Sequence, residues 1–202
     1  MISGRIIVLS APSGSGKGTV IGKLLSINKG ISPSISYTSR TPRPSERDGE
    51  HYFFITKERF TSMIDKGEFI EWDHYQGDYY GTSKGNILCL LDSGADVIFD
   101  ITITGAYAIR AHFPQAALVF LLPPSFEELE KRLRNRGTET EEKIMGRLTE
   151  ARREIGALEK FDYYIINDDA ERAALRLNAI ITAEKCRIFD EEAAIIMQRV
   201  MK

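Results

Sequence analysis

Cysteine and histidine are scarce in this sequence. The two cysteines, Cys89 and Cys186, lie far apart, and His51, His74 and His112 form no cluster with metal-ligand spacing. These counts argue against a disulfide framework and against a zinc site built from these residue types. Because Cys89 stands inside a run of aliphatic residues, we expect both cysteines to pack as small apolar side chains in the core.

Long hydrophobic runs are also missing. The longest one, Ala116–Leu122, stops at Pro123-Pro124, whereas a helix needs about 20 apolar residues to cross a bilayer. The run Ile6–Leu9 near the N-terminus is too short for the apolar core of a secretory signal. We therefore expect the protein to be cytoplasmic and to make no contact with a membrane.

The chain has no excess of charge of one sign. Its 202 residues include 27 Lys and Arg against 29 Asp and Glu, so the net charge is −2. Without a basic field, a nucleic acid polymer is not expected as a partner. A content of 43% hydrophobic and 28% charged residues is typical of a globular protein, and the length corresponds to roughly one to one and a half domains.

Short apolar runs alternate with helical patterns along the chain. Runs without polar alternation are typical of strands buried on both faces of a parallel sheet. The predicted strands are Ile6–Leu9, Asp96–Phe99, Ala116–Leu122 and Tyr163–Ile166. The predicted helices are Ser83–Ser93, Thr104–His112 and Ser125–Asn135, together with a helix after the first strand that carries Val20, Leu24 and Leu25. The alternation predicts an α/β fold, a parallel sheet flanked by helices.

Two segments interrupt this rhythm. Residues 36–82 are rich in Tyr, Ser, Thr and Arg and contain the hairpin-like Tyr75–Tyr80, which indicates an inserted α+β subdomain. Residues 132–147 hold four arginines among glutamates and lead into a predicted long amphipathic helix. The apolar positions of that helix are Ile144, Leu148, Ala151, Ile155 and Leu158.

A glycine-rich segment follows the first predicted strand and nearly fits the pattern G-x-x-x-x-G-K-[ST]. Gly14 and Gly16 allow the backbone N–H groups to surround a phosphate, and Lys17 supplies a mobile positive charge. A plain glycine-rich turn is the alternative, but the position between a strand and a helix favours a phosphate loop. The predicted phosphate-binding residues are Ala11, Pro12, Ser13, Gly14, Ser15, Gly16, Lys17, Gly18 and Thr19.

This loop departs from the strict pattern at two positions. Ala11 stands at the first glycine, and Gly18 stands where a Mg²⁺-binding hydroxyl is usual. Thr19 follows one place later and is our candidate metal ligand.

A second set of phosphate-binding residue types lies between Thr38 and Ile55. The planar guanidinium groups of Arg40 and Arg43 can each donate two hydrogen bonds to a phosphate, and the Tyr52 hydroxyl is a further donor. The segment begins with the pattern T-[ST]-R, which ends at Arg40. A basic residue follows three places later, an acidic residue three places after that, and then a glycine, a tyrosine and a further aromatic residue. In this pattern the sequence resembles guanylate kinases.

The resemblance extends over residues 6–168. Segments 68–72 and 77–82 look like the guanine-binding segments of the family, 132–139 with Arg147 looks like its lid, and 166–168 resembles the part near the donor adenine. It implies a single P-loop domain, 1–202. In that domain 1–35, 83–125 and 150–202 form the core, 36–82 the GMP-binding insert and 126–149 a small lid.

The resemblance also implies the reaction, a reversible transfer of the γ-phosphoryl group of ATP to GMP, and to dGMP as well, with Mg²⁺ bound to ATP. A carboxylate at Glu71 suits guanine, which presents two adjacent N–H donors, and does not suit adenine. Asn167 would lie near adenine, although a cap of the last helix is an equal alternative for Asn167-Asp168. The implied catalytic residues are Lys17, Arg132, Arg136 and Arg147. The implied GMP-binding residues are Ser36, Arg40, Arg43, Tyr52, Glu71, Tyr80, Thr82 and Asp100.

Two positions depart from the family, and two other functions stay open. Thr102 and Thr104 stand where guanylate kinases usually carry Asp and Gln. A relative that phosphorylates another small phosphate ester would not need Glu71. A guanylate-kinase-like module that binds peptides without catalysis typically has a degraded phosphate loop, whereas Gly14, Gly16 and Lys17 are all present here. The sequence does not indicate an oligomeric state.

Overall fold

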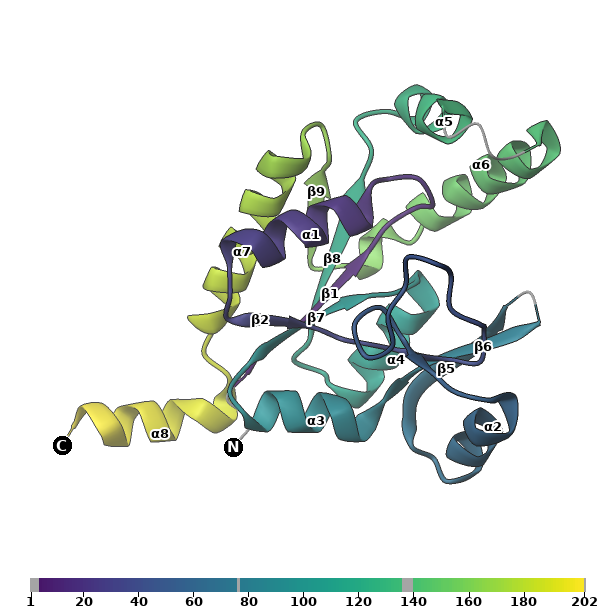
Figure 1. Ribbon diagram of the computed structural model, residues 1–202. Helices are drawn as coiled ribbons and strands as arrows, with labels where there is room; N and C mark the ends of the chain where they lie inside the picture. Colours follow the sequence, from purple (N-terminus) through teal and green to yellow (C-terminus); the bar gives the residue numbers. More distant parts are fainter. Residues whose placement is uncertain (1–3, 76, 136–139, 202) are drawn as a thin grey trace.

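The protein is described by a computed structural model that covers residues 4–75, 77–135 and 140–201 (Figure 1). Its centre is a five-stranded parallel sheet in the order β2-β7-β1-β8-β9, which confirms the predicted α/β class. The strands are β1 (Ile6–Ser10), β2 (Ile31–Pro33), β7 (Asp96–Asp100), β8 (Ala117–Leu122) and β9 (Tyr163–Ile166). Of these, β2 was not predicted, because three residues are too few to show a pattern.

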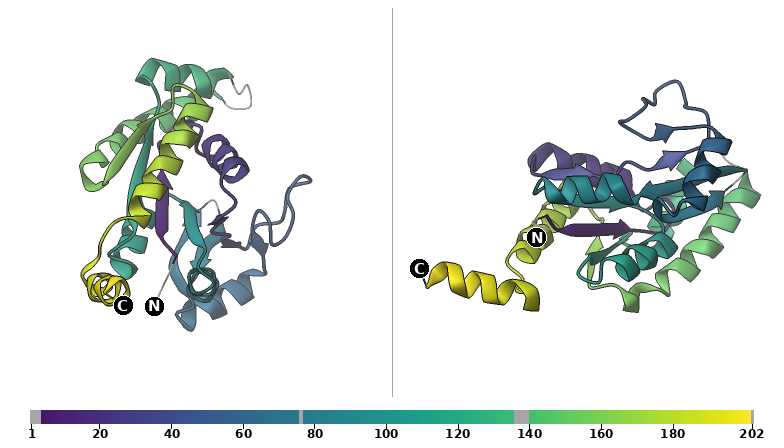
Figure 2. Two further views of the ribbon diagram at one scale, coloured as in Figure 1. Left: turned by 90° about the vertical axis from the view of Figure 1, so that its left-hand side faces the viewer. Right: turned by 90° about the horizontal axis from the view of Figure 1, so that it is seen from below.

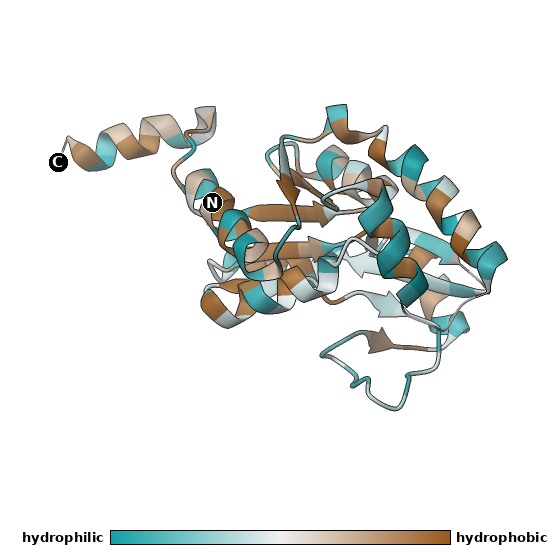
Figure 3. Ribbon diagram, turned by 90° about the horizontal axis from the view of Figure 1, so that it is seen from above, coloured by the Kyte–Doolittle hydropathy of each residue, from teal (hydrophilic) through white to brown (hydrophobic). Residues whose placement is uncertain are grey.

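The central sheet is buried on both faces, which explains its continuous apolar runs. Alternate residues of β1 point to opposite sides: Ile7 and Leu9 join one cluster, and Val8 joins the other. Figure 3 shows the strands as the most hydrophobic part of the ribbon. The first cluster is covered by α1 (Lys17–Ile27) and α7 (Ala170–Lys185), and the second by α3 (Lys84–Asp92) and α4 (Ile103–His112).

The predicted helices form with bounds close to those expected. The Thr102 hydroxyl accepts a hydrogen bond from the Gly105 backbone N–H at 3.2 Å, so α4 begins at Ile103. The prediction that the long amphipathic helix reaches Leu158 is wrong. Helix α6 (Glu141–Ile155) ends before Gly156, and Leu158 opens a separate 3₁₀ turn, Leu158–Lys160.

The segment 36–82 forms a second sheet, in the order β4-β3-β6-β5, with α2 packed against one face. Strands β5 and β6 pair antiparallel, as the hairpin-like sequence predicts. The rings of Phe69 and Tyr79 stack on Phe60 of α2, with centroid separations of 4.4 and 5.3 Å. The elements are β3 (Tyr37–Thr38), β4 (Phe53–Phe54), α2 (Lys57–Asp65), β5 (Phe69–Tyr75) and β6 (Asp78–Ser83).

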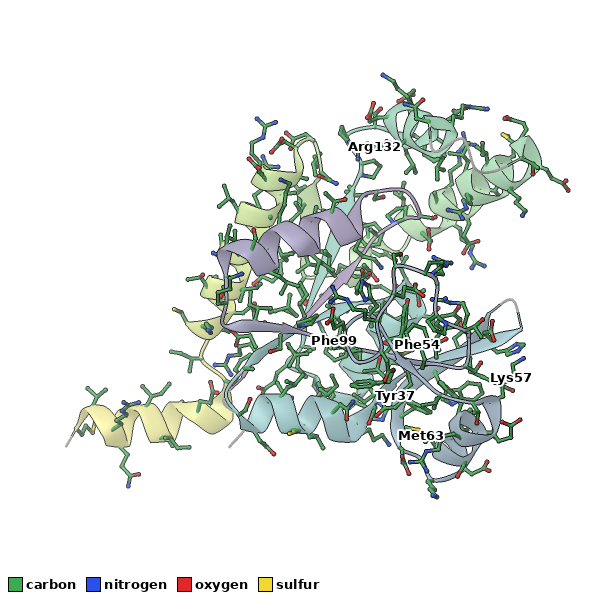
Figure 4. All side chains as sticks on the ribbon, viewed as in Figure 1. Tyr37, Phe54, Lys57, Met63, Phe99 and Arg132 are labelled. Carbon is green, nitrogen blue, oxygen red and sulfur yellow. The ribbon has the colours of Figure 1, made fainter. Side chains whose placement is uncertain are left out.

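Two excursions flank one end of the central sheet. Helices α5 (Phe126–Asn135) and α6 share a small apolar cluster that includes Leu129 and Leu148. In Figure 4, Arg132 on α5 and Met63 on α2 mark the two excursions, and Phe99 of the central sheet lies between them. The two excursions therefore lie on different sides of the same end of the central sheet.

The C-terminal helix α8 (Asp190–Val200) extends away from the rest of the chain (Figure 2). Arg5 holds its start through a two-point ion pair with Glu192, with both N···O distances 2.8 Å, and its guanidinium lies over the Phe189 ring. Within the described ranges, no helix is long and apolar enough to cross a membrane.

Both cysteines are exposed, so the prediction that they pack in the core is wrong. The buried face of α3 carries Ile87 and Leu91. Cys89 follows Ile87 by two residues, which is about 200° around the helix, and therefore faces outward. A run of aliphatic letters concealed the amphipathic character of this helix.

Gly81 gives a test of the packing in the second sheet. A Cβ at this position would lie 2.9 Å from the Trp72 Cβ and 3.0 Å from both the Glu71 carbonyl oxygen and the Phe60 ring. We expect Gly81→Ala to lower the free energy of unfolding by about 1–3 kcal/mol in urea titrations. The matched change Gly85→Ala, where only a hydroxyl lies near, at 3.9 Å, should leave it equal or raise it by up to about 1 kcal/mol. Equal losses in the two variants would contradict this account.

Candidate active site

The site lies at the carboxyl edge of the parallel sheet. Strands β1 and β7 end at Ser10 and Asp100, and loops that follow adjacent parallel strands meet at one edge. The loop after β1 has Gly14 at φ +93° and Gly16 at φ +88°, conformations that favour glycine. Helix α1 begins immediately afterwards at Lys17, so its positive N-terminal end faces the loop.

The loop encloses a cavity of about 420 Å³. The Ser15 hydroxyl is buried in the cavity wall without a hydrogen-bond partner among the described residues. Backbone N–H groups, a buried hydroxyl and a lysine are the donors that a phosphate requires. The cavity is lined by Ala11, Pro12, Ser13, Gly14, Ser15, Gly16, Lys17, Gly18, Thr19, Thr102 and Glu154.

Asn167 fastens this loop to the neighbouring strand. Its side-chain amide donates to the Ser15 carbonyl oxygen at 2.7 Å. The contact is so close that a Cβ at Gly16 would lie 2.6 Å from the same amide nitrogen. The alternative that Asn167-Asp168 caps the last helix of the core is wrong, because the cap of α7 is Asp169, which accepts from the Arg172 N–H at 2.9 Å.

Lys17 joins the loop to the end of β7. Its ammonium group lies 2.8 Å from an Asp100 carboxylate oxygen and donates to the Ile101 carbonyl oxygen at 2.9 Å. The Ser10 hydroxyl donates to the same carbonyl at 2.7 Å. The lysine is therefore positioned by the strand end while it lines the phosphate cavity.

Two of the three predicted lid arginines reach the loop region. Arg132 donates to the Asn167 carbonyl oxygen at 3.1 Å and pairs with Glu128, one turn earlier on α5. Arg147 on α6 donates to the Ser13 hydroxyl oxygen at 3.1 Å. Arg136, the third, lies outside the described residues.

Glu154 is a further acidic residue at the loop. It follows Arg147 by two helical turns and so faces the same side of α6. Burial raises the pKa of Glu154, and the nearby Ser13 backbone N–H opposes this shift. Its Oε2 is buried without a partner in the described part of the chain. Helix α6 therefore contacts Ser13 through Arg147 and places the Glu154 carboxylate near the same residue.

A second cluster of residue types that can bind an anion lies in the insert. The Arg40 guanidinium makes a two-point ion pair with Glu46, with both N···O distances 2.9 Å, and lies over the Tyr52 ring. Glu46 also accepts from the Arg43 backbone N–H at 2.8 Å, and these bonds lower its pKa to about 2. Arg43 itself is exposed.

Two tyrosines complete this region. The Tyr52 and Tyr80 rings meet edge to face, with centroids 6.0 Å apart. Burial raises the pKa of Tyr52, so its phenol keeps the proton that it would donate to an anion. Arginine and tyrosine side chains from the segment between β3 and β4 and from β6 thus converge here.

Glu71 owes its orientation to an irregularity in β5. Phe69 and Glu71 are two residues apart and would share a face of a regular strand. The register with β6 shifts between them, so Phe69 packs on Phe60 while Glu71 pairs with Thr82 on the other face. No local pattern in the sequence indicates this bulge.

Glu71 is the end of a short hydrogen-bond chain. The Thr82 hydroxyl donates to Glu71 Oε1 at 2.6 Å, and the Ser36 and Thr82 hydroxyl oxygens are 3.2 Å apart. Because the Thr82 proton is committed to Glu71, Ser36 must be the donor to Thr82. Burial raises the pKa of Glu71. Three of the predicted GMP-binding residues are therefore in contact.

A comparison with known proteins identifies the family. A family model described as guanylate kinase matches residues 3–184. The chain belongs to the guanylate kinase family. It is 45% identical to the guanylate kinase of Caldanaerobacter subterraneus subsp. tengcongensis, over 92% of this chain and 90% of that one. It is 46% identical to that of Halalkalibacterium halodurans, over 91% and 90%.

A solved structure supports the same assignment. The crystal structure of guanylate kinase from Anaplasma phagocytophilum is 33% identical and has a TM-score of 0.74, over 92% of this chain and 88% of that one. Helix α8 lies beyond the part of the chain that the guanylate kinase family model matches.

Two site residues were not assigned from the sequence. Glu46 stands in the acidic position of the guanylate kinase signature, six residues after Arg40, and that spacing could have suggested a partner. Glu154 follows Arg147 by seven residues on a predicted amphipathic helix. The shared helix face was therefore visible, but the charge run around it is also typical of a solvated surface.

The ion pair of Arg40 and Glu46 gives a test by titration. The folded-state pKa of Glu46 is about 2, below its ordinary value of 4.5. The pair therefore stabilises the fold fully above the ordinary pKa and loses this contribution as the pH falls toward about 2. An NMR titration should find the pKa of Glu46 near 2 in the wild type and raised toward 4.5 in Arg40→Ala, where only the hydrogen bond from the Arg43 backbone N–H still lowers it. Arg47→Ala, which removes a neighbouring arginine that pairs with Glu50, should not move it. An ordinary pKa in the wild type would refute the pairing.

Proposed function

We propose that this protein transfers the γ-phosphoryl group of ATP to GMP and dGMP, reversibly, giving ADP and GDP or dGDP. The observation that carries the proposal is that two clusters of phosphate-binding residue types accompany one half-buried carboxylate, Glu71, whose neighbours suit guanine. The first cluster lines the loop cavity, and the second surrounds Arg40. A site with two anion cradles suits transfer between two nucleotides.

The Glu71 end of the insert suits guanine. A carboxylate can accept both N1–H and N2–H of this base, while O6 requires a donor. The hydroxyls of Thr82 and Ser36 are held beside Glu71, and a rotation of the Thr82 hydroxyl would turn its proton toward O6. Asp100, at the end of β7, would face the base or its ordered water.

The arginine and tyrosine cluster would hold the GMP phosphate. Arg40 is already positioned by Glu46, while Arg43 is exposed and free to swing inward. Tyr52 and Tyr80 supply neutral hydroxyl donors. The two arginines would neutralise the negative charge of the GMP phosphate, and the phosphate would be held by several contacts.

The loop cavity would hold the phosphates of ATP, with Lys17 on the β- and γ-oxygens. Arg132, Arg136 and Arg147 would close over the transferring group, and Asn167 would lie beside the adenine. Closure of the lid, 126–149, and of the insert, 36–82, onto the core would exclude water, which would otherwise receive the phosphoryl group.

The cavity suits a divalent ion that arrives with the nucleotide. Thr19 and Thr102 contribute hydroxyl groups to its wall, and oxygen is the ligand that Mg²⁺ prefers. Among the described residues there is no group of three acidic, histidine or cysteine side chains, so phosphate and water oxygens would complete the shell. When bound, Mg²⁺ would neutralise charge on the phosphates, with Thr19 as the protein ligand.

The chemistry needs no side-chain base. The attacking oxygen of GMP is already an anion, so this chain's residues act by in-line positioning and by stabilising charge on the moving phosphoryl group. Lys17 starts close to its working place, since its contacts with Asp100 and Ile101 hold it at the cavity.

The substrate assay tests the whole proposal. In a coupled assay of ADP formation with MgATP, we expect turnover with GMP and dGMP and little with AMP, UMP or CMP. A peptide-binding module would show no turnover with any of them. A kinase for another phosphate ester would leave GMP unused, and either result would overturn the proposal.

The role of Glu71 is tested by base selection. Loss of its carboxylate removes the acceptor of two guanine N–H groups, so Glu71→Ala should reduce the ratio of kcat/KM for GMP over AMP at least tenfold, since a hydrogen bond to a charged group contributes about 1.5–3 kcal/mol. The matched variant Glu68→Ala, a half-buried carboxylate three residues earlier, should keep the ratio. An unchanged ratio in Glu71→Ala would remove Glu71 from this role.

A further inference from the structure

A second cavity lies beside Glu71, between β5 and the first turns of α4. Its volume is about 330 Å³. Its wall includes two acidic residues of β5, Glu71 and Asp73, and two threonines at the start of α4, Thr102 and Thr104. Carboxylates and hydroxyls together suit a ligand that is itself rich in hydroxyl groups.

The sheet register places Asp73 on the substrate face. Glu71 pairs with Thr82, and Asp73 pairs with Tyr80. Paired residues point to the same side of a sheet, and so do residues two apart in one strand. Asp73 therefore shares the face of Glu71 and Tyr80, while Trp72 between them faces α2 with Tyr79.

Asp73 lies in the same row as Tyr80, one row along the sheet from the row of Glu71 and Thr82. The row of Glu71 and Thr82 would hold the base, and Tyr80 in the next row would contact the phosphate. Two residues of a strand span about 6.7 Å, roughly one ring system. The part of a nucleotide that joins base to phosphate is the sugar, so Asp73 stands where the ribose passes.

Asp73 has acceptor capacity to offer a ligand. Its Oδ1 accepts from the His74 backbone N–H at 2.7 Å. Within the described residues its Oδ2 has no hydrogen-bond partner, and the side chain is exposed to the cleft. Thr102 uses its hydroxyl oxygen to accept from Gly105 and retains a proton to donate. A sugar with vicinal hydroxyls matches these groups, and a carboxylate that accepts from a ribose hydroxyl is a recurrent arrangement.

We propose that Asp73 accepts a hydrogen bond from the ribose 2′-hydroxyl of GMP, and that the cavity between β5 and α4 seats this sugar. The inference rests on the proposed function. Asp73 is then the residue that discriminates between GMP and dGMP, whereas Glu71 discriminates between guanine and adenine. The enzyme then uses dGMP, but less efficiently than GMP.

The test compares GMP with dGMP. A hydrogen bond to a charged acceptor is worth about 10- to 100-fold in kcat/KM, so the wild type should prefer GMP by that factor. Asp73→Ala should reduce the preference to within about threefold by lowering kcat/KM for GMP and sparing dGMP. Asp73→Asn keeps an acceptor oxygen and the same shape, and should retain part of the preference. Asp65→Ala, an exposed carboxylate on α2, should retain all of it.

The outcomes separate this inference from the proposed function. No turnover of the wild type with either GMP or dGMP would overturn the proposed function itself. Turnover with GMP and an unchanged ratio of GMP to dGMP in Asp73→Ala would overturn only the role of Asp73. An equal loss for both substrates in Asp73→Ala and Asp73→Asn would overturn it too, because a structural role affects the two sugars alike.

Discussion

Parallel pairing of β1 with β7 places Leu9 opposite Asp100 and brings the phosphate loop and the end of β7 to one edge. Lys17 then joins the two by its contacts with Asp100 and the Ile101 carbonyl. The loop is supported from the other side by Asn167, at the end of β9. The rest of the site depends on this edge, because both excursions from the core are mounted around it.

The arginines of the site are positioned before any phosphate is present. Glu46 holds Arg40, Glu128 and the Asn167 carbonyl hold Arg132, and the Ser13 hydroxyl contacts Arg147. Such pairing limits the conformations of long side chains, so less entropy is lost when a phosphate binds. It also explains how a chain with a net charge of −2 can concentrate positive charge at two places.

Local sequence patterns were enough to predict the fold class and to select many of the candidate site residues. The buried strands, the glycine loop and the arginine signature are continuous in sequence, so each can be recognised from neighbouring residues alone. Features that depend on distant partners could not be seen. The bulge before Glu71 exists only relative to β6, and Asn167 was ambiguous until Ser15 lay beside it. Cys89 was misplaced because an all-apolar run hides which helix face is buried.

In the proposed site, a base that binds would replace existing hydrogen bonds within the protein and would not only add new ones. In the structure, Ser36 donates to Thr82 and Thr82 donates to Glu71, whose carboxylate is partly buried. A base that enters must return an acceptor to the hydroxyl and donors to the carboxylate, since an unmatched buried group costs about 1–3 kcal/mol. Guanine offers both on one edge, with two donors beside O6. Adenine offers the wrong group to each partner, so in the proposed site the same three hydrogen-bonded residues would disfavour it.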